Sequence, residues 1–253
     1  MRRPPLKKRK HNFQKTFSDG FRHFRSPFFS QTMTDSKTLF DSVYEKVRSI
    51  LENAPGCHDF DHTLRVLHNA RMIADGELDK NDVRSRSAVE LAALLHDCAR
   101  PEEMESQGKL CHAEAGAVKS ETILRSCGCK DEELIRIVSE CVKRHRYRGK
   151  NAPESLIDKI VYDADKLDSI GAVGVGRSFH FAGRAGARLH NSAEEALSGE
   201  EYGREDSAYR EYLVKLRNVP GRMLTETGRK AGEDRAAFMH GFFRQLIRET
   251  GIE

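Results

Sequence analysis

The sequence predicts an all-α protein, and three observations support this fold class. Apolar residues recur at three- and four-residue intervals along most of the chain, which is the spacing of amphipathic helices. No convincing run alternates apolar and polar residues as a half-buried strand does. No internal repeat is present, and 253 residues, 38% of them hydrophobic and 32% charged, suffice for the core of one globular domain. We therefore expect a single helical bundle over residues 35–253, preceded by a disordered basic extension over residues 1–34.

The N-terminal extension differs in charge from the rest of the chain. Residues 1–33 hold nine Lys or Arg and one acidic residue, a net charge of +8, and the remaining residues carry −4. Prolines interrupt the basic run at residues 2–10, and its like charges repel one another, so disorder is expected. Three interpretations stay open: a nuclear-import cluster, an organelle transit peptide, or an extension without a role ahead of a functional start near Met33, which we favour.

Charge, hydropathy and cysteine content restrict the class of protein. The mildly acidic body argues against a nucleic-acid-binding surface outside the basic extension. No stretch approaches about 18 uninterrupted apolar residues, so we expect no membrane span. The six cysteines form no C-x-x-C pair, and Cys127-Gly-Cys129 is too tight for a usual zinc knuckle. We expect reduced thiols and a cytoplasmic protein, with nuclear or organellar targeting by the extension as the alternative.

Helices are expected in a definite order along the chain. The first begins near Ser36 and ends before the Pro55-Gly56 turn. The third is the buried run 91–95, which follows a charged connection over residues 78–86 and precedes a helix break at Arg100-Pro101. Five glycines between residues 171 and 186 suggest tight turns or close packing. The remaining helices are expected at residues 61–74, 112–125, 131–144, 153–170, 208–216 and 225–250, with a polar excursion at residues 192–207.

The buried run 91–95 ends in His96 and Asp97, side by side. Apolar residues at every position of the run indicate a helix that is buried on most sides, so it carries this pair into the interior. Ionisable groups are costly there unless they are paired or bound to a cation. By itself the doublet is also compatible with packing alone, the Asp accepting backbone N–H groups while the His fills space.

Further histidines and an aspartate occur at helix ends or within helices. His62 opens the second helix, Asp165 lies within the sixth, and His112 and His145 stand at the start of the fourth and the end of the fifth. Helical bundles build metal sites from side chains on facing helices. Nitrogen and oxygen donors without Cys suit a borderline transition metal in an open, catalytic site better than a closed structural zinc site.

A second His-Asp doublet, His58-Asp59, occurs in a different setting. It precedes a helix instead of ending an apolar run. We interpret Asp59 or Asp61 as the cap of that helix. His58 is placed at the edge of the pocket.

Three blocks of the sequence, taken in order, resemble a known family. They are His58-Asp59-x-x-His62-x-x-Arg65-Val66, Leu94-Leu95-His96-Asp97 and Asp163-Ala164-Asp165-Lys166-Leu167-Asp168-x-Ile170-Gly171-Ala172-x-Gly174. This order resembles the HD-domain metal-dependent phosphohydrolase superfamily. More narrowly, the residues of the three blocks are similar to those of its small stand-alone hydrolases, some of which act as nucleotide pyrophosphohydrolases. The likeness covers about residues 36–250.

The resemblance implies a metal site on identified residues. The four metal-binding positions of the family are matched by His62, His96, Asp97 and Asp165. The ion at these positions is usually divalent: manganese, magnesium, nickel or zinc. His112 and His145 fall where two-metal members place extra histidines, which makes them candidates for a second metal or for phosphate contacts.

The same resemblance implies hydrolysis by water. A divalent ion lowers the pKa of a bound water and polarises a phosphoryl oxygen, so no Ser or Cys nucleophile is needed. Arg65 and Lys166 are candidate catalytic cations for the charge of the transition state. For Arg65, a salt bridge to Asp61 or to a neighbouring helix is the alternative. Asp168 is expected to act as a base or to orient a ligand.

The expected function is hydrolysis of a small phosphorylated substrate, a nucleotide above all, by a pyrophosphohydrolase or phosphatase. A phosphodiesterase of the same superfamily uses the same ligands, so that activity stays open. A non-catalytic HD-fold module that senses or scaffolds is the alternative from another class. The presence of all four ligands argues against it.

Overall fold

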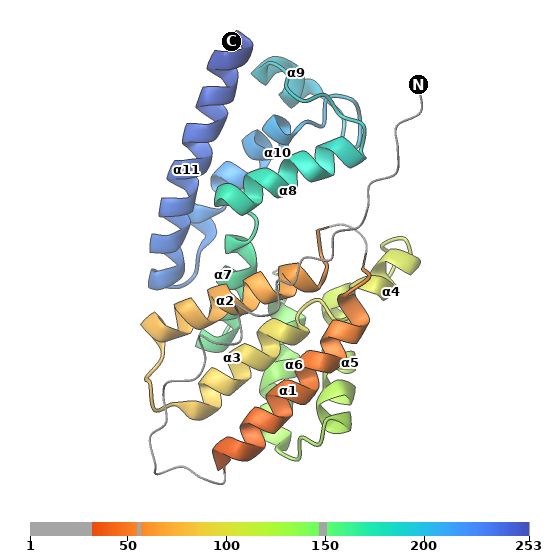
Figure 1. Ribbon diagram of the computed structural model, residues 1–253, viewed down its shortest axis with the longest axis vertical. Coiled ribbons are helices and arrows are strands. Elements are labelled where there is room, and N and C mark those ends of the chain that lie inside the picture. Colours follow the sequence, from red (N-terminus) through yellow and green to blue (C-terminus); the bar gives the residue numbers. More distant parts are fainter. Residues whose placement is uncertain (1–31, 55–56, 147–150, 253) are drawn as a thin grey trace, which may run out of the picture. The chain divides into compact units, whose positions relative to one another are not determined.

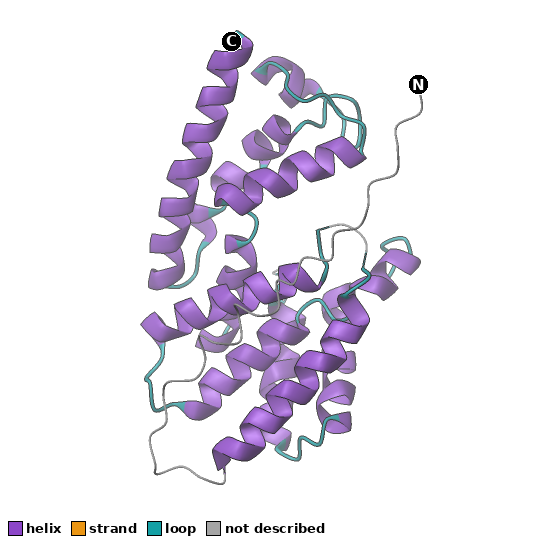
Figure 2. Cartoon of the chain, viewed as in Figure 1, coloured by secondary structure: helices purple, strands orange, loops and turns teal. Residues whose placement is uncertain are grey.

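The computed structural model describes residues 32–54, 57–146 and 151–252, and within these ranges it contains helices and loops without a strand (Figure 2). The prediction of an all-α protein is confirmed. Residues 38–253 form one compact unit. The expected disorder of residues 1–34 falls almost wholly outside the described residues and stays a prediction.

The helices are joined mostly by short connections and are labelled in Figure 1. In chain order they are α1 (Thr32–Leu51), α2 (Phe60–Glu77), α3 (Val83–Leu95), α4 (Arg100–Glu105), α5 (His112–Ser126), α6 (Glu132–Arg144), α7 (Leu156–Leu167), α8 (Gly171–Arg184), α9 (Ala193–Ser198), α10 (Ala208–Val214), the 3-10 turns η3 (Leu216–Asn218) and η4 (Pro220–Arg222), and α11 (Glu226–Thr250). None of the described helices combines the length and apolar character that crossing a membrane requires.

Helix α3 lies among three other helices because its second half is apolar on nearly every side. From Ala88 to Leu95, every residue but Glu90 is buried. α3 contacts α2, α6 and α7, and α5 packs along α6 (Figure 1). Since His96 and Asp97 directly follow α3, the doublet is carried into the interior as expected.

Asp82 begins α3 within the segment that was expected to be a charged connection. Its carboxylate accepts the backbone N–H of Ser85 at 3.0 Å. We expect Asp82→Ala to lower the free energy of unfolding by about 1 kcal/mol at neutral pH. The hydrogen bonds from Ser85 lower the pKa of Asp82, so this stabilisation is present above the carboxyl's ordinary pKa and declines as the pH falls through the lowered value.

Urea unfolding of the wild type and Asp82→Ala, at neutral pH and below about pH 3, measures this difference. Asn caps a helix about as well as Asp, so Asp82→Asn is the matched control and should stay within a few tenths of a kcal/mol of the wild type. Equal stability of Asp82→Ala and the wild type at neutral pH would contradict the role of this cap.

Helix α8 is the main departure from the expected elements. The tight turns expected over residues 171–186 are replaced by a helix over Gly171–Arg184. Each glycine costs about 1 kcal/mol relative to alanine in a helix, which is why this segment does not look helical in the sequence. Gly174 does pack closely, though against its own segment and α11 rather than against the metal site: a Cβ atom there would lie 2.2 Å from the Ser169 carbonyl oxygen and 2.8 Å from the Met239 side chain.

Short helices also occupy two segments that were expected to be irregular. α4 follows the expected break, with Pro101 in its first turn, where a missing N–H costs nothing. α9 lies within the polar excursion and begins with a capping box between Ser192 and Glu195. Helices of six residues show no clear periodicity, so the pattern of apolar residues did not reveal them.

Candidate metal centre

Six of the predicted site residues meet in one cluster, and most of them come from helix ends. His96 and Asp97 directly follow α3. His62 lies in the first turn of α2, where Asp59 caps the helix by accepting the His62 backbone N–H at 2.9 Å. Helices α5, α6 and α7 contribute His112, His145 and Asp165. All but Asp165 are at most 2% exposed, so the cluster is buried.

His62 and His96 face each other through their Nε2 atoms, which lie 3.2 Å apart. The Nδ1 of His62 lies 2.7 Å from an Asp168 carboxylate oxygen, and the Nδ1 of His96 lies 2.8 Å from the Ala93 carbonyl oxygen. Both partners accept hydrogen bonds, so each Nδ1 carries the proton. Burial lowers the pKa of His96 to about 3, which keeps it neutral. Its Nε2 therefore offers a lone pair, directed at the Nε2 of His62.

His112 and His145 repeat this arrangement. Their Nε2 atoms also lie 3.2 Å apart. The Nδ1 of His112 lies 2.8 Å from a Glu103 carboxylate oxygen, and the Nδ1 of His145 lies 2.6 Å from the Val142 carbonyl oxygen. Burial lowers the pKa of His112 to about 4. The Nε2 of His112 therefore offers a lone pair, directed at the Nε2 of His145.

The Asp97 carboxylate lies between the two pairs. Its Oδ2 is 3.6 Å from the Nε2 atoms of both His62 and His96. Its Oδ1 is 3.3 Å from Nε2 of His112 and 3.7 Å from Nε2 of His145. Burial alone would raise the pKa of Asp97, but the neighbouring histidines and Arg100 hold it well below its usual range. Each oxygen of an ionised carboxylate thus faces one histidine pair.

Two donor sets follow from these distances. The first, here called the His62 set, comprises His62, His96, Asp165 and Oδ2 of Asp97; the Asp165 carboxylate lies 3.5 Å from Nε2 of His62. The second, called the His112 set, comprises His112, His145 and Oδ1 of Asp97.

The residues present fit divalent ions. Two imidazoles bound at about 2.1 Å to one tetrahedral ion have nitrogens roughly 3.4 Å apart. Both histidine pairs are close to this separation. Neutral imidazoles and carboxylates are the donors that borderline divalent metals prefer, and neither set contains Cys.

Asp168 and Arg65, two predicted catalytic residues, contact each other. Arg65 donates to both Asp168 carboxylate oxygens, from Nε at 2.6 Å and from an Nη at 3.2 Å. Arg177 of α8 donates to the same carboxylate at 2.6 Å. With His62 as a further partner, Asp168 is a fully bonded carboxylate, 1% exposed, which favours the orienting role over that of a base. For Arg65, the salt bridge to a neighbouring helix is the one observed.

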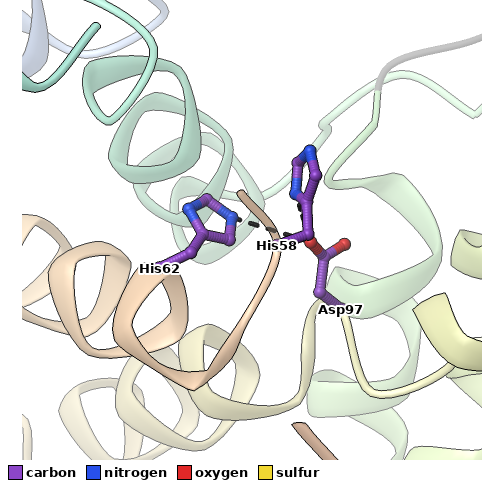
Figure 3. A group of neighbouring side chains, drawn as sticks. All are labelled: His58, His62 and Asp97. Atoms are coloured by element: carbon purple, nitrogen blue, oxygen red, sulfur yellow. Dashed lines mark hydrogen bonds and ion pairs between the residues drawn. The ribbon is translucent and has the colours of Figure 1, made fainter. Parts of the chain in front are cut away.

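Lys166 and His58 lie at the accessible side of the cluster. Lys166 donates to the Asp165 carboxylate at 2.7 Å and is 27% exposed. His58, placed by the sequence at the edge of the pocket, is 37% exposed, and its Nδ1 lies 3.0 Å from Oδ2 of Asp97. Figure 3 shows His58 and His62 on the same Asp97 carboxylate. His58, His62 and Asp97 thus form a further group of potential ligands.

Glu103 is a site residue that the sequence did not indicate. It lies on α4, and it binds His112, Arg100 and Arg146. Burial opposes its ionisation, yet the bonds from His112 and Arg100 lower the pKa of Glu103 to about 2. No apolar periodicity leads to it; the signal available was an acidic pair, Glu102-Glu103, shortly after the His-Asp doublet.

Comparisons with known proteins identify the family. The HD domain family matches residues 59–170, a range that includes all six clustered side chains and also Glu103 and Asp168. The uncharacterized protein YpgQ of Bacillus subtilis (strain 168) is 35% identical over 209 residues, which cover 82% of this chain and 92% of that protein.

Solved structures show the same fold. The crystal structure of Bacillus subtilis YpgQ in complex with ADP is similar with a TM-score of 0.64 and 28% identity, covering 85% of this chain and 96% of that one. A predicted HD-superfamily hydrolase from an uncultured Thermotogales bacterium is similar with a TM-score of 0.56 and 29% identity, covering 84% and 91% of the two chains. The fold, the donor sets and these similarities lead to one conclusion: the chain belongs to the HD-domain superfamily of metal-dependent phosphohydrolases.

Proposed function

We propose that the protein hydrolyses a phosphate ester or anhydride bond of a small phosphorylated molecule, a nucleotide in particular, with the help of two divalent ions. One observation carries the proposal: two pairs of buried histidines face each other through their Nε2 atoms, and one carboxylate, Asp97, lies between them. Burying so many ionisable groups together is unfavourable unless they are paired or bind cations.

The two donor sets would each hold one ion. His62, His96 and Asp165 would bind the first and His112 and His145 the second, with Asp97 shared by both. A divalent ion supplies Lewis acidity in such a site, because it lowers the pKa of a water and polarises phosphoryl oxygens. Manganese, magnesium, nickel and zinc are the candidate ions, and activity after reloading with each of them identifies the one that supports hydrolysis.

The chain's own residues perform the remaining tasks. The hydrogen bonds at Nδ1 keep the four imidazoles in one tautomer and one orientation before substrate arrives. Lys166, beside Asp165 and partly exposed, can meet phosphate oxygens at the accessible side and stabilise the charge that spreads over them during transfer.

Two observations support a nucleotide as substrate. Bacillus subtilis YpgQ, similar over 85% of this chain, has a crystal structure in complex with ADP. The chain beyond residue 33 carries a net charge of −4, which suits a small substrate held by metal and a few cations better than a nucleic-acid polymer.

The test uses the full chain, stripped of metal with EDTA and reloaded in turn with manganese, magnesium, nickel or zinc. Nucleoside mono-, di- and triphosphates and a phosphodiester such as bis(p-nitrophenyl) phosphate are the substrates. Release of pyrophosphate, of phosphate or of nitrophenol separates a pyrophosphohydrolase, a phosphatase and a phosphodiesterase. We expect turnover of nucleotides that EDTA abolishes. No turnover with any ion, together with unchanged metal content in His96→Ala, would refute the proposal.

A further inference from the structure

We infer that Glu103 and Asp168 are matched positioning residues, each supporting one of the two proposed ions independently of the other. The inference rests on the proposed two-ion centre. It concerns residues that do not themselves belong to either donor set.

Asp168 supports the His62 set. It accepts the Nδ1–H of His62 at 2.7 Å and is itself held by Arg65 and Arg177, each at 2.6 Å. Arg177 also donates to the Asp168 backbone carbonyl at 3.1 Å, so both ends of the residue are fixed. Because an ionised carboxylate only accepts, the imidazole proton stays on Nδ1 and Nε2 remains free to bind a cation.

Glu103 supports the His112 set with the same chemistry from a different part of the chain. It accepts the Nδ1–H of His112 at 2.8 Å. Two guanidinium groups hold it, that of Arg100 at 2.6 Å and that of Arg146 at 2.8 Å. A histidine, a carboxylate and two arginines thus occur twice, once on each side of Asp97.

The two supporting groups share no residue, and Arg100 of the Glu103 group also donates to Oδ1 of Asp97 at 3.0 Å, on the side of the His112 set. Asp168 follows α7 and receives its arginines from α2 and α8, whereas Glu103 lies on α4 and receives its arginines from α4 and from residue 146, just after α6. Among the described residues, the two carboxylates share no hydrogen-bond partner. Loss of one carboxylate should therefore release one imidazole and leave the other oriented.

The two remaining histidines differ from His62 and His112 in this respect. His96 and His145 donate Nδ1–H to backbone carbonyl groups three residues earlier, at Ala93 and Val142. Such bonds cannot be altered by changing a side chain. Within each set, one imidazole is consequently oriented by the backbone and the other by a side-chain carboxylate. Substituting that carboxylate should therefore change the metal affinity of its own set.

Calorimetric titration of the metal-stripped full chain with Mn²⁺ tests this inference. The wild type should bind two ions per chain, and His62→Ala and His112→Ala each identify one binding step by removing it. Glu103→Ala should weaken the His112 step by about 10- to 100-fold and change the His62 step by less than about threefold. Asp168→Ala should do the reverse.

Conservative variants test the inference if the alanine variants misfold, and they should restore part of the lost metal affinity. Glu103→Gln and Asp168→Asn keep an oxygen that can accept the Nδ1–H, so each should lose less affinity than the alanine variant, and they decide the question if the alanine variants do not fold. Glu102→Ala is the matched control, since the neighbouring carboxylate on α4 pairs with Lys119 and touches no site histidine. It should titrate like the wild type.

The outcomes separate the inference from the function on which it rests. A wild type that binds fewer than two ions would refute the two-ion centre and the inference with it. If the wild type binds two ions, but Glu103→Ala and Glu103→Gln weaken both steps equally or neither, only the inference is refuted. The same holds if removal of either histidine abolishes both steps. A purely structural role would lower thermal stability without a step-specific loss of affinity.

Discussion

Asp97→Ala is expected to remove metal binding and activity while the helical fold persists. Each oxygen of Asp97 faces a different pair of histidines, within 3.3 to 3.7 Å of their Nε2 atoms. The substitution therefore takes a ligand from both proposed ions at once, and it removes the negative charge that offsets theirs. Loss of an outer carboxylate costs about 10- to 100-fold, so loss of this shared ligand should cost more than about 100-fold in activity.

Three measurements on Asp97→Ala check this expectation: metal content after dialysis, helical content by circular dichroism, and nucleotide hydrolysis. Asp97→Asn isolates the charge, because the amide keeps the size of the side chain; it too should bind metal poorly. Asp61→Ala is the matched control for removing a carboxylate, since Asp61 is exposed on the first turn of α2. A variant Asp97→Ala that keeps two ions and full activity would overturn the central place assigned to this residue.

The central doublet could be predicted because its position depends on a local pattern. An apolar run without a polar face has to be buried, so whatever follows it directly is buried too. This holds for His96 and Asp97, which are 0% and 1% exposed. The helix-end positions of His62, His112 and His145 could also be predicted from local patterns, because capping residues and breaks mark where helices begin and end.

The contacts of the supporting residues could not be predicted, because they have no local sequence pattern, even though Asp168 and Arg65 were themselves candidates. Arg65 is 103 residues from Asp168, and Arg146 is 43 residues from Glu103. Nothing in the spacing of such residues indicates which arginine reaches which carboxylate, and for Arg65 the sequence left open whether a salt bridge would go to Asp61 or to a neighbouring helix. Arg177 lies on α8, a helix that was not predicted because glycines occur throughout its sequence.

Asp163 lies within the metal-binding motif, but its contacts are with the start of α11 and not with the metal centre. Its carboxylate is fully buried and accepts the backbone N–H groups of Leu224 at 2.9 Å and of Thr225 at 2.8 Å, together with the Thr225 hydroxyl at 2.6 Å. Thr225 in turn caps α11 by accepting the N–H of Gly228. Asp163 thus joins α7 to the start of α11.

Asp163→Ala should consequently lower the free energy of unfolding by about 3 kcal/mol or more. The substitution leaves the buried N–H and hydroxyl of Thr225 and the partly buried N–H of Leu224 without an acceptor, and each unsatisfied buried donor costs about 1–3 kcal/mol. The melting temperature should fall by several degrees, about 2–4 °C for each kcal/mol in a chain of this size. Urea unfolding and thermal melting measure the loss.

Metal content distinguishes this structural role from one in the metal centre, even though Asp163 is two residues from Asp165. The folded Asp163→Ala protein should bind as many ions as the wild type. Asp163→Asn keeps an accepting oxygen and should lose less stability, whereas Thr225→Val removes the hydroxyl alone and should account for part of the loss. Because these residues share one network, the effects of Asp163→Ala and Thr225→Val should not add in the double variant. Unchanged stability of Asp163→Ala, or a specific loss of metal from it, would contradict the structural role of Asp163 and its distinction from Asp165.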